Sequence, residues 1–223
     1  MKKISLIALA LCGSAAVFAQ DNTPQLTTPM AVKTRFGVRA GVNMADLTFK
    51  NLPSGSDVTE AQSKTSFNGG LFVNVPISSA FRFQPELSFS SQGGKLQGPS
   101  GAGSGLLGEQ DLHYINLPLN FQFMSSKGFF IQTGPQLGFL LDAKLKSTTS
   151  GSSAEVENED NFDKIDFSWS GGVGYLSRIG LGVDLRYNIG IANIIKDNTS
   201  GLEGTAKNSV GQFSLIYHFG AGK

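Results

Sequence analysis

Five charged side chains stand inside runs in which every second residue is apolar. They are Arg39, Arg82, Glu86, Asp184 and Arg186. Arginine and carboxylate groups form hydrogen-bonded ion pairs, and they also attract mobile ions. The set can therefore act as the selectivity filter of a pore or as a paired plug that closes and braces a narrow interior. The plug is favoured because an unpaired buried charge is strongly disfavoured, and we expect the surplus arginine to lie near a water-filled mouth.

The histidines do not predict catalysis. His113 and His218 are the only two, and His218 shares a face with Ser214 in a two-residue alternation. A lipid-modifying hydrolase built on a barrel would need its Ser and His on the lipid-facing side, near the outer rim. Alternation points Ser214 and His218 inward, so we expect an interior histidine that forms hydrogen bonds, and no enzyme.

Two other segments resemble ligand sites only loosely. The glycine-rich stretch 98–105 lacks the Gly-Lys-Ser/Thr ending of a phosphate-binding loop. A later segment is rich in carboxylates but lacks the residue order of a calcium loop, so a solvated acidic loop is expected. Weak divalent bridging to anionic surface sugars is the alternative, and no metal site or cofactor is predicted. The acidic residues are Glu155, Glu157, Glu159, Asp160, Asp163 and Asp166.

Strict two-residue alternation, the period of a β-strand with two unlike faces, recurs along the chain. One row is dense in Phe, Leu, Ile and Val, and the other is dominated by Gly, Ser, Asn and Gln with a few charges. The pattern predicts eight strands, at 36–44, 67–75, 81–90, 115–123, 129–141, 165–175, 179–189 and 212–219.

The connections between these strands alternate in length. Short turns are predicted at 77–80, 125–128 and 177–178, and long loops at 50–65, 93–111, 143–163 and 195–207. Short periplasmic turns and long outer loops are typical of outer-membrane barrels. The fold class predicted is therefore all-β, an eight-stranded antiparallel up-and-down transmembrane β-barrel with four long outer loops and three short periplasmic turns. A soluble lipocalin-like barrel, with its apolar row turned inward around a ligand, is the alternative.

Aromatic residues lie toward the ends of the predicted strands, where a membrane barrel carries its interfacial girdles. The predicted girdle residues are Phe81, Phe123, Phe129, Phe130, Tyr187, Tyr217 and Phe219.

Composition narrows the class of protein further. Only 16% of the 223 residues are charged, against about 25% in an ordinary soluble domain. The formal net charge of +1 gives no support for nucleic-acid binding, which needs a basic stripe. Beyond the N-terminus no apolar run approaches the roughly 20 residues of a membrane helix, so a membrane span would have to be a barrel.

The N-terminus reads as a secretory signal peptide at 1–19. Lys2 and Lys3 precede an apolar run, and small residues lead up to Ala19. Cleavage there removes Cys12, the only cysteine, so no disulfide is expected. A lipid anchor on Cys12 is disfavoured because Leu11, not a small residue, precedes it. The expected organisation is signal peptide 1–19, polar periplasmic lead 20–33 and outer-membrane barrel 34–220.

Five stretches, in this order, resemble the PorT-like outer-membrane β-barrel proteins, a group also described as porin-family proteins. They are Phe36-Gly37-Val38-Arg39-Ala40-Gly41-Val42-Asn43, Phe83-Gln84-Pro85-Glu86-Leu87-Ser88, Tyr114-Ile115-Asn116-Leu117-Pro118-Leu119, Thr133-Gly134-Pro135-Gln136-Leu137-Gly138 and Leu185-Arg186-Tyr187-Asn188-Ile189-Gly190. The resemblance implies an eight-stranded barrel in the outer membrane of a diderm bacterium and no reaction.

We therefore expect a structural or interaction role through the outer loops. The expected partners are outer-membrane lipid and lipopolysaccharide, the barrel assembly machinery and an extracellular or envelope protein, with no nucleic acid. A narrow solute channel and a hydrophobic-ligand-binding barrel are the alternative functions.

Overall fold

The computed structural model describes residues 33–50, 60–97, 106–149, 152–157, 161–195 and 205–220. These residues belong to one compact unit, Val32–Lys223, which contains the predicted barrel domain. The predicted signal peptide, 1–19, and the predicted lead, apart from Lys33, lie outside the described residues.

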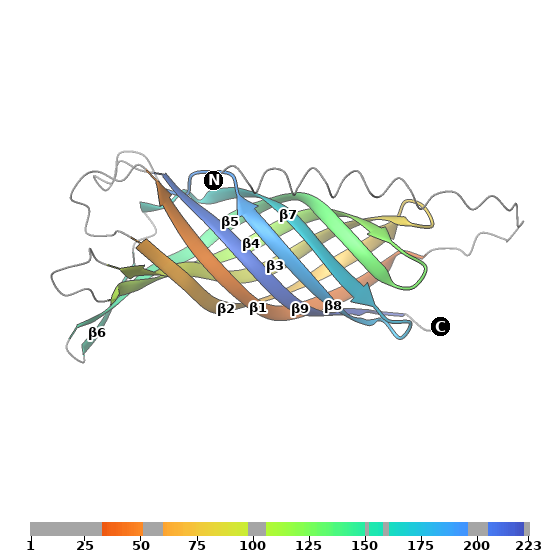
Figure 1. Ribbon diagram of the computed structural model, residues 1–223, viewed down its shortest axis with the longest axis horizontal. Helices are drawn as coiled ribbons and strands as arrows, with labels where there is room; N and C mark the ends of the chain where they lie inside the picture. Colours follow the sequence, from red (N-terminus) through yellow and green to blue (C-terminus); the bar gives the residue numbers. More distant parts are fainter. Residues whose placement is uncertain are drawn as a thin grey trace, which may run out of the picture. The chain divides into compact units, whose positions relative to one another are not determined.

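Eight antiparallel strands close into a barrel, and a ninth, short strand lies outside this ring, where it pairs with the end of one of the eight (Figure 1). The ring order is β1-β2-β3-β4-β5-β7-β8-β9, and pairing of β1 with β9 closes it. This topology confirms the predicted closed, eight-stranded antiparallel barrel, in which every strand of the ring has a partner on both edges. The strands are β1 (Arg35–Lys50), β2 (Glu60–Pro76), β3 (Phe81–Gln97), β4 (Leu106–Met124), β5 (Phe129–Thr149), β6 (Ser152–Glu157), β7 (Ile165–Leu176), β8 (Leu181–Gly190) and β9 (Thr205–His218).

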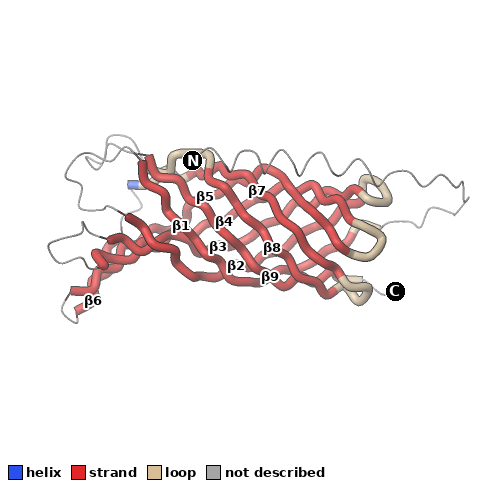
Figure 2. Tube along the Cα trace, in the orientation of Figure 1, coloured by secondary structure: helices blue, strands red, loops and turns tan. Residues whose placement is uncertain are grey.

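Three tight turns, at 77–80, 125–128 and 177–180, lie at one end of the barrel (Figure 2). We call this the turn end and the opposite end the loop end. The third turn is longer than predicted, because Ile179 and Gly180 belong to it and not to the next strand. Gly180 has φ of 90° and donates its N–H to the Ser177 carbonyl at 3.0 Å, so β8 begins only at Leu181.

The strands run further toward the loop end than the alternation predicted. Within the predicted loop 93–111, β3 continues to Gln97 and β4 begins at Leu106; the predicted loops 50–65 and 195–207 likewise contain the starts of β2 and β9. Within 143–163, β5 continues to Thr149 and β6 folds back on it as a hairpin. Polar residues stand in both rows there, and apolar residues such as Ala143 and Ala206 face inward, so the two rows lose their contrast while the strand pairing continues.

The two faces of the barrel wall differ sharply in polarity. Along β8 every second side chain is exposed on the outside, from Leu181 through Leu185 to Ile189, and the intervening Asp184 and Arg186 are buried. A soluble lipid carrier would need the opposite arrangement, with its apolar row inside, so the lipocalin-like alternative is wrong. No helix among the described residues is long and apolar enough to cross a membrane.

Pairs of aromatic side chains lie on the outer surface of the barrel at the turn end. Phe81 packs against Phe123 and Phe129 against Tyr175, with ring centroids 5.2 Å and 4.9 Å apart. These rings lie where a membrane barrel presents aromatic residues to the interface. Phe130 was predicted for the same girdle, but its side chain is buried in the lumen. The prediction was wrong there because Phe129 and Phe130 are adjacent, and only one of two neighbours on a strand can face lipid.

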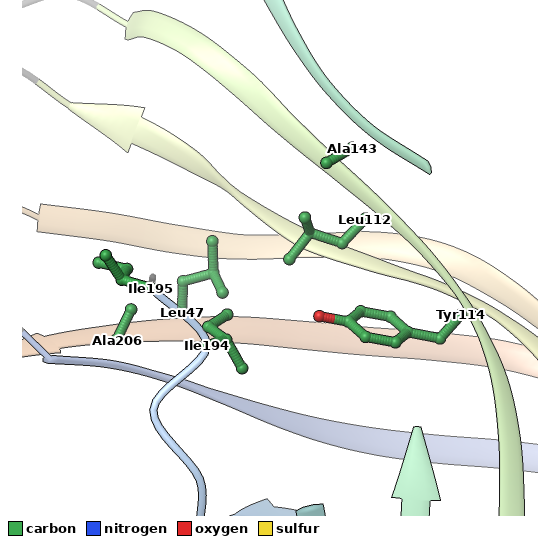
Figure 3. Close-up of a cluster of buried hydrophobic side chains, with 7 residues drawn as sticks. All are labelled: Leu47, Leu112, Tyr114, Ala143, Ile194, Ile195 and Ala206. Carbon is green, nitrogen blue, oxygen red and sulfur yellow. The ribbon is translucent and has the colours of Figure 1, made fainter. Parts of the chain in front are cut away.

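An apolar cluster fills the lumen at each end. The turn-end cluster comprises Phe72, Met124, Phe130, Leu176 and Ile216. The loop-end cluster comprises Leu47, Leu112, Tyr114, Ala143, Ile194, Ile195 and Ala206. Figure 3 shows the loop-end cluster, in which Ile194 and Ile195, from the segment after β8, lie beside strand residues. The polar lumen therefore lies between two apolar layers.

Candidate functional site in the barrel lumen

Four of the five predicted charges meet at mid-lumen and form what we call the central charge layer. Glu86 forms ion pairs with two arginines: its Oε1 lies 2.9 Å from Arg39 Nη1, and its Oε2 lies 3.0 Å from Arg186 Nη1. Arg186 Nη2 also contacts Asp184 Oδ2 at 3.0 Å. The four side chains are 2% exposed or less and carry two positive and two negative charges. The layer is therefore electrically balanced and sealed from solvent.

The strand alternation and one glycine position this layer. Arg39, Glu86 and Arg186 come from β1, β3 and β8, each on the inward row of its strand. Gly172 on β7 is the cross-strand neighbour of Arg186. A Cβ atom at Gly172 would lie 2.9 Å from Arg186 Cγ and 2.5 Å from the Leu185 carbonyl oxygen. Glycine thus leaves the space through which the arginine stem crosses the lumen.

Arg82, the surplus arginine, lies apart from the charge layer near the turn end, where it is only half-buried. Its Nη1 donates to Asn74 Oδ1 at 3.0 Å. A directed amide chain then joins it to the layer: Asn74 donates to Gln122, Gln122 to Gln132 and Gln132 to Asp184 Oδ2, at 2.8, 3.1 and 2.9 Å. Arg82 is therefore connected to the layer through hydrogen bonds and not through an ion pair.

A second polar group lies on the loop-end side of the charge layer, centred on Asn43. The Asn43 amide donates to Ser90 Oγ at 3.0 Å, and its Oδ1 accepts from Asn68 at 2.6 Å and from Gln212 at 3.1 Å. Ser214 links this group to the charge layer, because its hydroxyl accepts from Arg39 at 2.8 Å and donates to Asn68 at 3.1 Å. The interior next to β1, β2, β3 and β9 is therefore densely hydrogen-bonded.

The opposite wall of the lumen differs. Asn120, Ser170 and Asn188 lie on the inward rows of β4, β7 and β8 and are 2% exposed or less. Their side-chain polar atoms have no hydrogen-bond partner in the described part of the chain. Buried polar groups are nearly always satisfied by protein or water, so this wall is the part of the lumen suited to hydration.

Neither histidine forms a hydrolase site with Ser214. His218 is buried against the Phe72 ring, with centroids 4.8 Å apart, and its Nδ1 has no partner among the described residues. The Ser214 hydroxyl bonds to Arg39 and Asn68 instead. The expected hydrogen bonding of an interior histidine is thus not seen at this nitrogen. His113 lies on the outside, with Nδ1 3.3 Å from Asp142 Oδ2.

The predicted acidic loop is divided among different elements. Glu155 and Glu157 lie on β6, opposite Lys146 and Lys144 of β5. Asp166 is not in a loop: it is the first inward residue of β7 and is 7% exposed. Glu159 and Asp160 lie outside the described residues. Within the described ranges, no three His, Cys, Asp or Glu side chains are grouped as a metal site.

A second set of ion pairs, which the alternation did not predict, lies near the loop end and is called here the rim group. Lys64 contacts Asp111 closely and Glu109 at 2.8 Å, and Lys146 contacts Asp111 at 2.9 Å. All four residues lie in segments predicted as loops or at their borders. Only the knowledge that these strands continue in register could have placed them together.

A closed antiparallel barrel with apolar residues outside and a polar, ion-paired interior defines an integral membrane β-barrel protein. The chain belongs to the outer membrane protein beta-barrel domain family, whose model matches residues 18–196. It is thus an outer-membrane barrel protein. No curated protein matches the chain.

The solved structures similar to this chain include two outer-membrane proteins. Ail, the attachment invasion locus protein of Yersinia pestis, is 14% identical, with 84% of this chain and 99% of Ail covered and a TM-score of 0.45. The outer membrane protein OprG from Pseudomonas aeruginosa is 13% identical, with 83% and 95% covered and a TM-score of 0.49.

Proposed function

We propose that this protein is a non-enzymatic outer-membrane barrel whose lumen is closed by the central charge layer and whose loop end serves for interaction. The observation that carries the proposal is Glu86, whose two carboxylate oxygens are each held by an arginine from a different strand. Such a bridge across the lumen braces the wall, and breaking it would leave a buried charge without its partner.

Burial favours the plug over a selectivity filter. A filter must offer its charges to an ion that enters and leaves, so the charges need access to water. In the charge layer no side chain is more than 2% exposed, and an apolar cluster covers the lumen at each end. The charges pair with one another and expose almost no surface to a passing ion, although Arg39 Nε, Arg186 Nε and Asp184 Oδ1 have no hydrogen-bond partner among the described residues.

The finer assignments follow from the sequence. We place the protein in the PorT-like, porin-family group, exported through a signal peptide at 1–19 and inserted by the barrel assembly machinery. The loop end faces the cell exterior, among lipopolysaccharide, and the turn end faces the periplasm. The β5–β6 hairpin, on which Val156 is 59% exposed, supports binding of an extracellular or envelope protein partner.

Conductance tests the closed lumen. In planar bilayers we expect the folded protein to give no more than flickering current, and the Glu86→Ala variant likewise. The decisive contrary result is a stable, ion-selective current from the parent protein that disappears in Glu86→Ala without loss of thermal stability. That result would make Glu86 part of a filter.

Cysteine labelling tests the orientation. The only native cysteine is Cys12, so single cysteines can be placed at Val156 on β6 and at Ser126 in an exposed turn. We expect an impermeant maleimide to label Val156→Cys on whole cells and Ser126→Cys only after lysis. The reverse pattern would invert the proposed topology.

A narrow solute channel is the second candidate function. The unpartnered wall of Asn120, Ser170 and Asn188 favours it, because those side chains could line a hydrated path beside the charge layer. A channel predicts steady conductance that falls when Asn120 and Asn188 are both replaced by leucine. Absence of steady conductance in the parent eliminates this candidate.

A further inference from the structure

A pocket of about 610 Å³ opens at the turn end of the barrel. All three tight turns contribute to it, through residues 79–80, 125–128 and 177–178. Its remaining lining comes from Arg82, Met124, Tyr175 and Leu176 on the adjoining strands. Small-molecule sites have volumes of roughly 300 to 1,000 Å³, so the pocket is large enough for a ligand.

The charge of this pocket is entirely positive. Arg82, Lys127 and Arg178 line it, and no carboxylate does. Arg35 is close enough to Arg82 for the two guanidinium charges to repel each other. Among the described residues, none of these four has a carboxylate within ion-pair distance. Glu86 and Asp184 are committed to Arg39 and Arg186 in the charge layer.

The floor of the pocket is closed. Met124 and Leu176 belong to the turn-end cluster and pack with Phe72, Phe130 and Ile216. An anion drawn in by the positive charges therefore meets an apolar layer and cannot pass into the lumen. The pocket is a dead-end vestibule suited to binding, not the entrance of a pore.

Arg82 is prepared to receive an anion. One of its guanidinium nitrogens is held by Asn74 at 3.0 Å, which fixes the plane of the group. Its Nε has no hydrogen-bond partner in the described structure, which is also true of Arg39 and Arg186, but of the three only Arg82 lines this open pocket. An unsatisfied buried donor costs free energy that a bound acceptor would recover. The exposed residues Ser79 and Ser126 bring hydroxyl donors to the same pocket.

We infer that the turn-end vestibule binds a phosphate-bearing anion. Guanidinium groups match phosphate oxygens in a planar, two-point geometry, and several cations around one pocket suit an anion of more than one charge. The phosphate can belong to an anionic phospholipid headgroup in the adjacent leaflet or to a soluble compound. Both can reach the vestibule, because the turns lie at the edge of the lipid-facing band.

Pyrophosphate is the probe for the first test, measured by titration calorimetry on the folded protein in nanodiscs of phosphatidylcholine. We expect saturable binding, weakened about tenfold in Arg82→Gln and in the double variant Lys127→Ala/Arg178→Ala. The matched control, Lys95→Ala/Lys164→Ala at the loop end, removes the same charge and should bind as the parent does. Lys127 and Arg178 are exposed in turns, so their replacement leaves the fold intact even if Arg82→Gln does not.

Repeating the titration in nanodiscs that contain phosphatidylglycerol distinguishes the two sources. If a lipid headgroup occupies the vestibule, pyrophosphate affinity falls in the parent and the double variant shows no such dependence on lipid. If the ligand is a soluble phosphate compound, the parent binds equally in both lipids. No saturable binding in phosphatidylcholine, or equal affinity in the parent and the double variant, would overturn the inference.

Discussion

Two sets of ion pairs, the central charge layer and the rim group, use the same residue types in different surroundings. Glu86 in the charge layer is fully buried, whereas Glu109 of the rim group is 33% exposed and Lys146 49% exposed. Lys64 and Asp111 of the rim group are themselves buried, but water screens Glu109 and Lys146, and pairs that water screens contribute about 0 to 1 kcal/mol. In the lumen, loss of one charged partner leaves the other charge buried and unpaired in a medium of low dielectric constant. Burial, and not the number of contacts, therefore decides how much each ion pair contributes to stability.

The two sets also differ in what they join. Arg186 on β8 and Glu86 on β3 come from opposite sides of the ring, with three strands between them in either direction. The rim pairs join β2 to β4, which are separated only by β3, and β4 to its neighbour β5, close to the ends of those strands. The charge layer thus ties walls together across the lumen, whereas the rim group reinforces the outer edge of the wall.

The largest expected effect is that of Glu86→Ala. Removal of the carboxylate leaves Arg39 and Arg186 buried with only Asp184 to balance them, which should lower the free energy of unfolding by about 3 kcal/mol. Urea unfolding followed by the fluorescence of Trp169, the only tryptophan, measures the change. A loss below 1 kcal/mol would show that the layer does not brace the barrel.

Gly172→Ala should have the next largest effect. The added methyl group would press on the Arg186 stem and on the backbone of β8, and overpacking of this kind costs about 1 to 3 kcal/mol. Gly171→Ala is the matched control, because a Cβ atom there meets no atom within 4 Å. Equal stability of the two variants would mean that Arg186 does not need the space beside Gly172.

How well the strands and their inward faces can be predicted from the sequence depends on the contrast in polarity between the alternating residues of each strand. Along β8, Leu, Val and Ile alternate with Asp, Arg and Asn, so the strand and its inward face can be derived from the sequence alone. Toward the loop end the contrast is lost, and 93–97 and 106–111 read as loop although they are paired strands. Adjacent apolar residues such as Phe129 and Phe130 leave the facing of each ambiguous.

The sequence could not predict which charged side chains pair with one another inside the lumen, and the reason is different. Alternation places Arg39, Arg82 and Glu86 on the inward face, but strand stagger and tilt decide which side chains meet. Arg82 and Glu86 share a strand, yet Glu86 binds Arg39 and Arg186 while Arg82 binds Asn74. The amide chain from Asn74 to Asp184 depends on the same stagger, so the sequence shows its members without showing their order.

Glu109→Gln should have a smaller effect, because it removes the partly exposed charge of the Lys64–Glu109 pair, which water screens. We expect the free energy of unfolding to fall by no more than about 1 kcal/mol at low salt, and the difference from the parent to shrink at 1 M salt. Glu86→Ala, by contrast, should keep its full effect at high salt. A salt-independent loss in Glu109→Gln would mean that the rim behaves like the lumen.

The smallest effect concerns pH at the rim. Glu109 lies on the part of β4 that precedes the lipid-facing residues 115–123. The hydrogen bond from Lys64 holds the pKa of its carboxyl below the ordinary value of 4.5. Partial burial opposes this shift, and the positive charges of Lys64, Lys95 and Lys146 add to it. A carboxyl whose pKa is lowered by folding stabilises the folded state above its unfolded pKa, and this contribution disappears as the pH falls through the folded value.

The stability difference between the parent and Glu109→Gln should therefore be constant near neutral pH and decline below about pH 4.5. Subtracting the two unfolding curves cancels the other carboxyl groups, which titrate in both proteins. As a control, Glu109→Gln is compared with Glu109 in proteins that also carry Lys64→Met. There the stability difference should lose most of its pH dependence, because the principal hydrogen bond to Glu109 is gone. A difference that grows on acidification, or that persists unchanged in the Lys64→Met background, would show that Lys64 does not stabilise the ionised form of Glu109.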